Sequence, residues 1–172
     1  MVPKLHRLLY ATDLSAGSID AFRYAVNYAN QHNAKLIVFH VINQRSITRS
    51  KILATFFNEG QEHKIRQKKV NAALKHMEKL LEVNCKNDPT DTHANIKNVE
   101  HLVVHYGKIA EEIVEKADMW GCESIILGPR RKRLLGRIFL PSISRKVIWG
   151  TNTPVHIITL PKGEVDTTFH SS

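Results

Sequence analysis

The segment from Gly128 to Pro141, GPRRKRLLGRIFLP, has the residue types of a phosphate-binding loop. It is longer than the about 2 to 6 residues usual between a strand and a helix, and long connections are often functional. It leads into Ser142, which is suited to begin a helix whose free N–H groups and dipole favour an anion. The alternative is a solvated basic loop. The basic residues of the segment are Arg130, Arg131, Lys132, Arg133 and Arg137.

Asp13 is the second residue placed for binding. It follows the apolar run LLYAT, and Ser15, a residue type that caps helices, comes two positions later. An aspartate in this position either faces a ligand or only caps the next helix. We favour the ligand, because ligands of α/β sheets bind beyond the carboxyl ends of the strands.

Catalytic motifs are absent from the sequence, which lacks GxSxG, GxxxxGK[ST], GxGxxG and HExxH. Ten histidines raise the question of a metal. His101 and His105 are four positions apart, and on a strand this places them about 13 Å apart, too far for one ion. We therefore predict no metal site, and we interpret His40 and His156 as core histidines with satisfied hydrogen bonds.

Strand-like runs alternate with helical patterns along the chain, which predicts a parallel sheet covered on both faces. The expected fold is a doubly wound five-stranded sheet of the flavodoxin-like class. The point where strand order reverses falls between the first and fourth strands, so a ligand is expected near residues 11–15 and 128–142. The expected strands are the run ending at Thr12-Asp13, then Lys35–Val41, Asn98–His105, Glu123–Leu127 and Pro154–Leu160.

A long basic amphipathic helix is expected from about Gly60 to Asn87. Its apolar stripe is needed by the core of the sheet, and its basic face lacks the aromatic residues that stack on bases. We interpret that face as solvated rather than as a membrane or nucleic-acid surface. The expected buried stripe is Ile65, Val70, Leu74, Met77 and Leu81, and the basic residues are Lys64, Arg66, Lys68, Lys69, Lys75 and Lys79.

Composition indicates one globular domain over residues 1–160, with residues 43–58 as an insertion and 161–172 as a polar tail. The chain has 172 residues, 42% of them hydrophobic, and a formal charge of +9, which favours anionic partners. Its longest apolar stretch is far shorter than the about 20 residues of a membrane helix, so no membrane insertion is expected. Two cysteines do not form a disulfide framework, and we predict a cytoplasmic protein.

The order of these elements resembles the universal stress protein family. The resemblance rests on the strand ending ATDLS, the segment GKIAEEIVEKA before the strand ESIILG, and the helix opening Ser142-Ile143-Ser144. It runs from about His6 to Leu160. The fold that it implies is the adenine nucleotide alpha hydrolase-like sheet with strand order 3-2-1-4-5.

The resemblance implies an altered adenine-nucleotide site. Family members that bind ATP carry the pattern G-x2-G-x9-G-[ST], and this chain has Gly128 and Ser142 but Arg131 and Pro141 at the second and third glycine positions. We therefore expect weak or absent binding of ATP or another adenine nucleotide, with Mg only as its companion. The candidate residues are Ala11, Thr12, Asp13, Val41, Leu127, Gly128, Arg130, Arg131, Ser142, Ile143 and Ser144.

The resemblance implies a regulatory or protective role in the stress response, without enzymatic turnover. Two alternatives stay open: a true ATP-binding switch, with or without slow hydrolysis, and a binder of polyanions or nucleic acid through residues 130–137. We expect a homodimer through residues 154–160, because an exposed apolar edge strand is normally protected by pairing. We also expect an anionic ligand at the basic loop and a protein partner of unknown identity.

Overall fold

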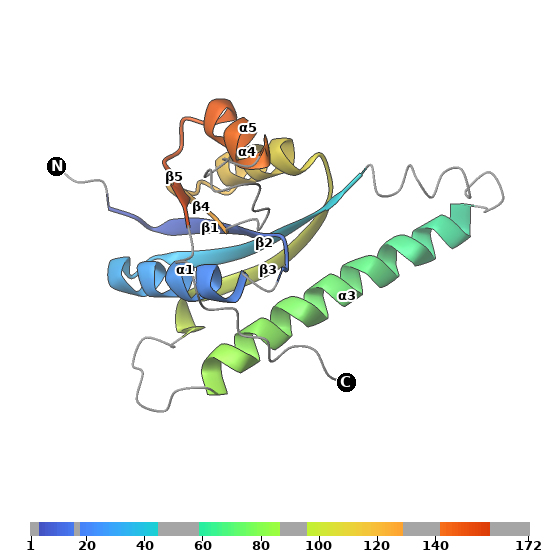
Figure 1. Ribbon diagram of the computed structural model, residues 1–172, viewed down its shortest axis with the longest axis horizontal. Helices are drawn as coiled ribbons and strands as arrows, with labels where there is room; N and C mark the ends of the chain where they lie inside the picture. The colour runs from blue at the N-terminus through green and yellow to red at the C-terminus, as the bar shows by residue number, and fades with distance from the viewer. Residues whose placement is uncertain (1–3, 16–17, 45–58, 87–95, 129–141, 159–172) are drawn as a thin grey trace, which may run out of the picture.

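Short runs of aliphatic and β-branched residues form five parallel strands in a computed structural model of the chain (Figure 1). The structure describes residues 4–15, 18–44, 59–86, 96–128 and 142–158. The strand order is β3-β2-β1-β4-β5, which confirms the predicted order and its reversal between β1 and β4. The strands are β1 (Arg7–Thr12), β2 (Lys35–Asn43), β3 (Val99–Gly107), β4 (Ser124–Leu127) and β5 (Val155–Ile157).

Helices cover both faces of this sheet, as right-handed crossovers between parallel strands require. α1 and α3 lie on one face, and α4 and α5 lie on the other (Figure 1). A short 3-10 helix, η1 (Ile96–Asn98), precedes β3. The α-helices are α1 (Ser18–His32), α3 (Glu59–Lys86), α4 (Ile109–Met119) and α5 (Ser142–Gly150).

Alternate side chains of β1 supply two separate cores. Leu8 and Tyr10 pack with α1, whereas Leu9 packs with α4 and α5. All three are fully buried. This two-residue alternation with apolar residues on both sides is typical of a central parallel strand, and it fixes β1 in the middle of the sheet with its carboxyl end between β2 and β4.

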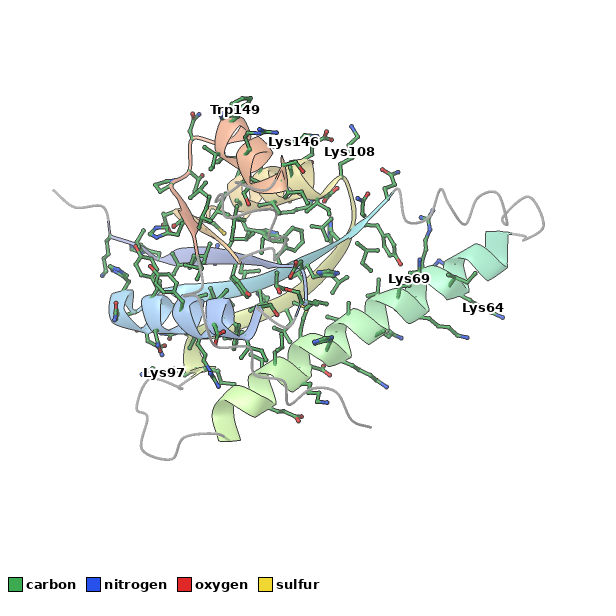
Figure 2. The ribbon with its side chains drawn as sticks, in the orientation of Figure 1. Lys64, Lys69, Lys97, Lys108, Lys146 and Trp149 are labelled. Atoms are coloured by element: carbon green, nitrogen blue, oxygen red, sulfur yellow. The ribbon has the colours of Figure 1, made fainter. Side chains whose placement is uncertain are left out.

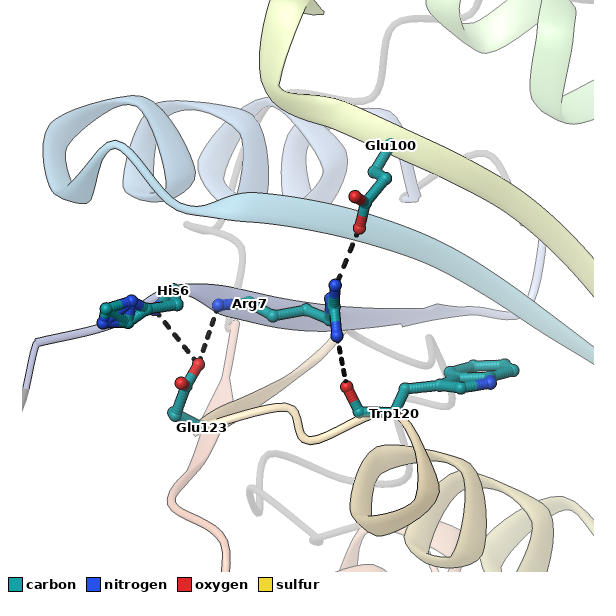
Figure 3. A network of polar contacts seen from close by, with 5 residues as sticks. All are labelled: His6, Arg7, Glu100, Trp120 and Glu123. Carbon is teal, nitrogen blue, oxygen red and sulfur yellow. Dashed lines mark hydrogen bonds and ion pairs between the residues drawn. The ribbon is translucent and has the colours of Figure 1, made fainter.

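A polar network ties the strands together at their amino ends, opposite the candidate site (Figure 3). The Glu123 carboxylate accepts hydrogen bonds from the N–H groups of Arg7 at 2.7 Å and His6 at 3.1 Å. The Arg7 guanidinium donates to the carbonyl oxygen of Trp120 at 2.7 Å and to Glu100 at 3.3 Å. One arginine thus joins β1, β3 and the connection from α4 to β4.

The long helix differs from expectation at its N-terminal end. It runs from Glu59 to Lys86, close to the predicted bounds. The prediction that Ile65 is buried was wrong, because this side chain is 41% exposed. The stripe that packs on the sheet begins further along, with Ala73, Met77 and Leu80 buried. Several predictions fall outside the described residues, namely the insertion after residue 44, the basic loop at 129–141 and the tail from residue 159.

Candidate nucleotide site

The carboxyl ends of β1 and β4 meet at the point where the strand order reverses. Thr12 at the end of β1 pairs with His40 of β2 on one side, and Ala11 pairs with Leu127 of β4 on the other. α1 follows β1 onto one face of the sheet, and α5 follows β4 onto the opposite face. Where the connections after two neighbouring strands go to opposite faces of the sheet, a crevice forms between them. α/β proteins bind their ligands in this crevice.

Two side chains shape the turn that follows β1. The Leu14 N–H donates to Thr12 Oγ1 at 3.1 Å, and the Ser15 N–H donates to Asp13 Oδ1 at 3.0 Å. Leu14 adopts a left-handed conformation with φ of 58°, which local bonds from Asp and Thr side chains stabilise. Thr12 is buried, but Asp13 is exposed. The turn therefore holds the Asp13 carboxylate outward in a fixed position.

Ser15 does not cap α1, contrary to the expectation from its residue type. The helix begins at Ser18, and the Ser18 N–H donates to the Ser15 carbonyl oxygen at 2.9 Å. Asp13 does not cap α1 either, because its Oδ1 accepts from Ser15 inside the turn. Among the described residues, no hydrogen-bond donor contacts Asp13 Oδ2.

His40 belongs to this site, although it was not among the candidate binding residues. Its Nδ1 lies 2.8 Å from the carbonyl oxygen of Thr12, so Nδ1 carries the proton and donates. Burial lowers the pKa of His40, against the raising effects of this hydrogen bond and of the Asp13 carboxylate. The expectation that His40 has a hydrogen-bond partner is confirmed. The side chain is only partly buried, and its hydrogen bond supports the turn after β1. No local pattern indicates this contact, because it depends on the register of β1 and β2, in which Thr12 pairs with His40.

Gly128 lies directly against the base of the site. A Cβ at this position would lie 3.4 Å from both Ala21 Cβ and Tyr10 Oη, so the β4 backbone approaches α1 closely. The Tyr10 hydroxyl donates to the Ser18 carbonyl oxygen at 2.8 Å, and burial raises the pKa of Tyr10 well above its usual range. Tyr10 is therefore a neutral structural support.

The other candidate residues divide into three groups. Ala11, Leu127 and Val41 lie on adjacent strands near the turn, with Leu127 and Val41 buried. Ser142, Ile143 and Ser144 form the first turn of α5, where Ser144 is buried and Ser142 is exposed. Arg130 and Arg131 fall outside the described residues. The structure thus brings Ala11, Val41 and Leu127 close to the turn at the carboxyl end of β1.

Comparison with known proteins identifies the family to which this chain belongs. A sequence profile described as the universal stress protein family matches residues 4–159. The chain belongs to the universal stress protein family. Universal stress protein MJ0577 of Methanocaldococcus jannaschii is 28% identical over 160 residues, which cover 88% of this chain and 93% of that protein. The expected family is therefore confirmed across nearly the whole chain.

Solved structures of family members share the fold. The structure of MJ0577 superposes with a TM-score of 0.69 at 23% identity and covers 94% of this chain and 100% of its own. A universal stress protein in complex with cAMP superposes with a TM-score of 0.55 at 18% identity, covering 91% of this chain and 98% of its own. A family member from Archaeoglobus fulgidus in complex with dAMP has a TM-score of 0.50 at 16% identity, covering 91% and 100%. The expected flavodoxin-like sheet is confirmed.

Two kinds of site are absent from the described residues. Within them, no three or more His, Cys, Asp and Glu side chains gather closely enough to bind a metal ion. The pair His101 and His105 lies on the strand β3, as predicted, and not on a helix. No described helix has the length and apolar character required to cross a bilayer.

Proposed function

We propose that this universal stress protein has a regulatory or protective role in the stress response and that its adenine-nucleotide site binds ATP weakly or not at all. The observation that carries the proposal is the contrast between the two sides of the site. On the side expected to bind the base, hydrogen bonds within the turn and from His40 hold Thr12 and Asp13 in place. On the side expected to bind phosphate, Arg131 and Pro141 replace two glycines of the family pattern. In this proposal the protein binds a ligand or a partner protein and does not catalyse a reaction.

The adenine side supports recognition of the base. Asp13 Oδ2 has no partner among the described residues, and an ionised carboxylate accepts hydrogen bonds from an amino group such as that of adenine. Val41 lies on the neighbouring strand, where its backbone would complete the contact. Relatives of the same fold are described as complexes with cAMP and dAMP. We assign this chain the same class of base.

The phosphate side supports only loose binding. Arg131 places a side chain where a glycine would let the backbone approach, and Pro141 removes one N–H donor just before α5. The loop's arginines compensate in part, since a guanidinium binds phosphate in a bidentate manner. Arginine side chains hold a phosphate in a less fixed position than backbone N–H groups do. Any bound triphosphate would bring its own Mg.

Cys122 is consistent with a cytoplasmic location. Its thiol is free and buried, and burial raises its pKa to about 11. A thiol that stays protonated reacts slowly with oxidants. The proposal therefore assigns it a packing role and the chain a reducing compartment.

Titration calorimetry with ATP, AMP and cAMP tests the proposal, together with mass spectrometry of ligand released from freshly purified protein. We expect ATP affinity no tighter than tens of micromolar and no stoichiometric ligand. Submicromolar ATP affinity, or full occupancy on purification, would instead establish the ATP-binding switch. Phosphate release measured in the same samples separates a switch that hydrolyses ATP slowly from one that does not.

The Asp13→Asn variant is the matched control for base recognition. Its amide oxygen preserves the acceptor for the Ser15 N–H, so the turn is retained. The Oδ2 acceptor becomes an amide donor, which opposes an adenine amino group. Residual binding of AMP should fall at least tenfold in this variant. If AMP binding is unchanged, Asp13 is only a turn residue.

A further inference from the structure

The outer side of α5 carries an exposed indole beside cationic side chains. Trp149 is 82% exposed, and the neighbouring Ile148 is 38% exposed. Arg145 and Lys146 are also exposed and stand about one helical turn before Trp149. Figure 2 shows Trp149 and Lys146 projecting from α5 away from the sheet. We call Arg145, Ile148 and Trp149 the α5 patch.

Neither the core nor the helix itself accounts for this patch. The buried residues of α5 are Ser144 and Val147, and Val147 is fully buried among the residues that α4 and α5 pack on the sheet. A buried aromatic side chain removes about 150–250 Å² from water, yet Trp149 is left in solvent. A helix dipole favours positive charge in the last turn, and α5 has no basic residue there.

The three residues of the α5 patch form one continuous strip on the helix. At 100° per residue, Ile148 and Trp149 lie about 60° and about 40° to either side of Arg145. Gly150 faces α4, because a Cβ at this position would lie 3.4 Å from Val114. The patch therefore faces solvent rather than the sheet or α4.

The positive charge of the patch is not neutralised within the described part of the chain. No ion pair there involves Arg145 or Lys146. α4 carries three exposed acidic residues, and two of them pair with neighbouring lysines. α4 lies on the flank of α5 that bears Lys146, so these carboxylates stand away from the patch. They are Glu111, Glu115 and Asp118.

We propose that the α5 patch binds an acidic segment of a partner protein. Apolar side chains of that segment cover Trp149 and Ile148, and one of its carboxylates binds Arg145. A guanidinium can hold a carboxylate through two parallel hydrogen bonds. Trp and Arg are also the residue types that contribute most to binding at protein interfaces. This inference rests on the proposed regulatory role and deepens it, because it names the chemistry of the partner.

Two other anionic partners fit this surface less well. Single-stranded nucleic acid stacks successive bases on several aromatic side chains, and Trp149 is the one aromatic residue of α5. A helix that binds a membrane inserts its apolar face, and the buried Val147 face of α5 is already packed on the sheet. The carboxylates of α4 also repel phosphate groups, whereas a protein segment can place its acidic residues at Arg145 alone.

Selection from a phage-displayed library of random 12-residue peptides on the immobilised full chain tests the proposal. We expect the selected peptides to be rich in Asp and Glu around at least one Phe, Leu or Trp. Fluorescence anisotropy of labelled synthetic copies then gives their affinities. The Trp149→Gln and Arg145→Glu variants should each bind these peptides at least tenfold more weakly. Both substitutions introduce good helix formers at exposed positions, so both variants should fold normally by circular dichroism.

Met119→Gln and Lys64→Glu are the matched controls. Met119 is 62% exposed on α4, and Lys64 is exposed on α3 (Figure 2). The two controls make the same kinds of change outside the α5 patch, and the affinity of each should change less than threefold. Equal losses in the controls and the patch variants would refute the proposal, because general charge or exposed apolar area would then explain binding.

Three further results would overturn the proposal. They are a selection that enriches no peptides, a selection that enriches peptides without acidic residues, and patch-dependent binding that is tighter to a 20-nucleotide oligothymidine or to phosphatidylserine vesicles than to the peptides. ATP affinity is measured in separate samples. Tight ATP binding would refute the weak nucleotide site without changing the peptide result, so the two failures are distinguishable.

Discussion

The imidazole of His40 donates a hydrogen bond to the carbonyl oxygen of Thr12, with Nδ1 and the oxygen 2.8 Å apart. Thr12 ends β1 and pairs with His40 of β2, and Thr12 opens the turn that presents Asp13. A titratable side chain therefore supports the binding turn from β2. Protonation of His40 adds a charge that burial opposes, so the fold and the turn respond to pH together.

The folded chain should lose stability as the pH falls below about 6.5, the ordinary pKa of histidine. Burial lowers the pKa of His40 in the folded state, despite the raising effects of Thr12 and Asp13 and with a small further lowering by His76. The unfolded chain then binds the proton at a higher pH, so the contribution of His40 is present above pH 6.5 and is lost on acidification. Urea unfolding between pH 7.5 and 5.5 measures the effect.

The His40→Asn variant isolates this contribution from the other histidines. Its side-chain amide can still donate to the Thr12 oxygen, but it does not titrate. The difference in unfolding free energy between the original chain and the variant should shrink on acidification, by at most about 1.4 kcal/mol per pH unit. A difference that stays constant across this range would contradict the lowered pKa.

Removing the Glu123 carboxylate should cost more stability than removing Glu100. Burial opposes the charged form of Glu123, but the hydrogen bonds from the Arg7 and His6 N–H groups outweigh it and lower the pKa. We expect Glu123→Ala to cost about 1.5–3 kcal/mol at pH 7, the usual value for hydrogen bonds to a charged group. Glu100→Ala removes an ion pair whose side chains are 41% and 28% exposed, and should cost about 0–1 kcal/mol.

Chemical denaturation at two pH values checks both parts of this prediction. A carboxylate with a lowered pKa stabilises the fold above its ordinary pKa of about 4.3 and loses that effect as the pH falls. The deficit of Glu123→Ala should therefore be smaller at pH 3.5 than at pH 7. Equal costs for the two alanine variants, or a deficit independent of pH, would argue against the network of Figure 3.

The strands and helices of the sheet were predictable from the sequence because they depend on local patterns. Runs such as LLYAT and KLIVFHV have the composition of strands buried on both faces, and their alternation with helices predicts a parallel sheet. The full strand order was implied by the family resemblance. The position of Asp13 at the carboxyl end of β1 was predictable from a local pattern as well, because Asp13 directly follows the run LLYAT. Its place at the reversal point needed only the strand order.

The remaining features depend on tertiary geometry that local patterns do not contain. Ile65 has helical spacing with the buried stripe, yet it is exposed because α3 extends past the sheet. Ser15 has the residue type of a cap, but a left-handed Leu14 shifts the start of α1 to Ser18. The His40 contact requires the register between β1 and β2, which a single sequence does not reveal.

We expect the chain to form a homodimer through β5, and Ile157→Pro to dissociate it. Among the described residues, β5 pairs only with β4. Ile125 donates to the Pro154 oxygen and the Ile158 N–H donates to Leu127, so residues 154, 156 and 158 face β4. Backbone groups alternate along a strand, which leaves Val155 and Ile157 facing the open edge. Proline at 157 removes a donor that pairing with a second copy would use.

His156 lies in the same strand but is not the informative position for this test. His156→Pro removes an N–H on the β4 side, so it should lower stability rather than affect the edge directly. Light scattering at 50 µM should give a dimer for the original chain and a monomer for folded Ile157→Pro. A monomer in the original chain would refute the dimer, and a dimeric Ile157→Pro would place the contact elsewhere.

Restoring the phosphate-binding pattern should require two substitutions rather than one. Arg131→Gly makes room for the backbone but leaves no donor at position 141, because proline has no N–H. Pro141→Gly returns that donor directly before Ser142 and the N-terminus of α5, where free N–H groups favour an anion. We expect less than a threefold gain in ATP affinity for Arg131→Gly and at least a tenfold gain for the double variant, measured by calorimetry. The salt dependence should also weaken in the double variant, because fixed amides replace a flexible charge. A single Arg131→Gly substitution that restores submicromolar binding would show that position 141 is not part of the phosphate cradle.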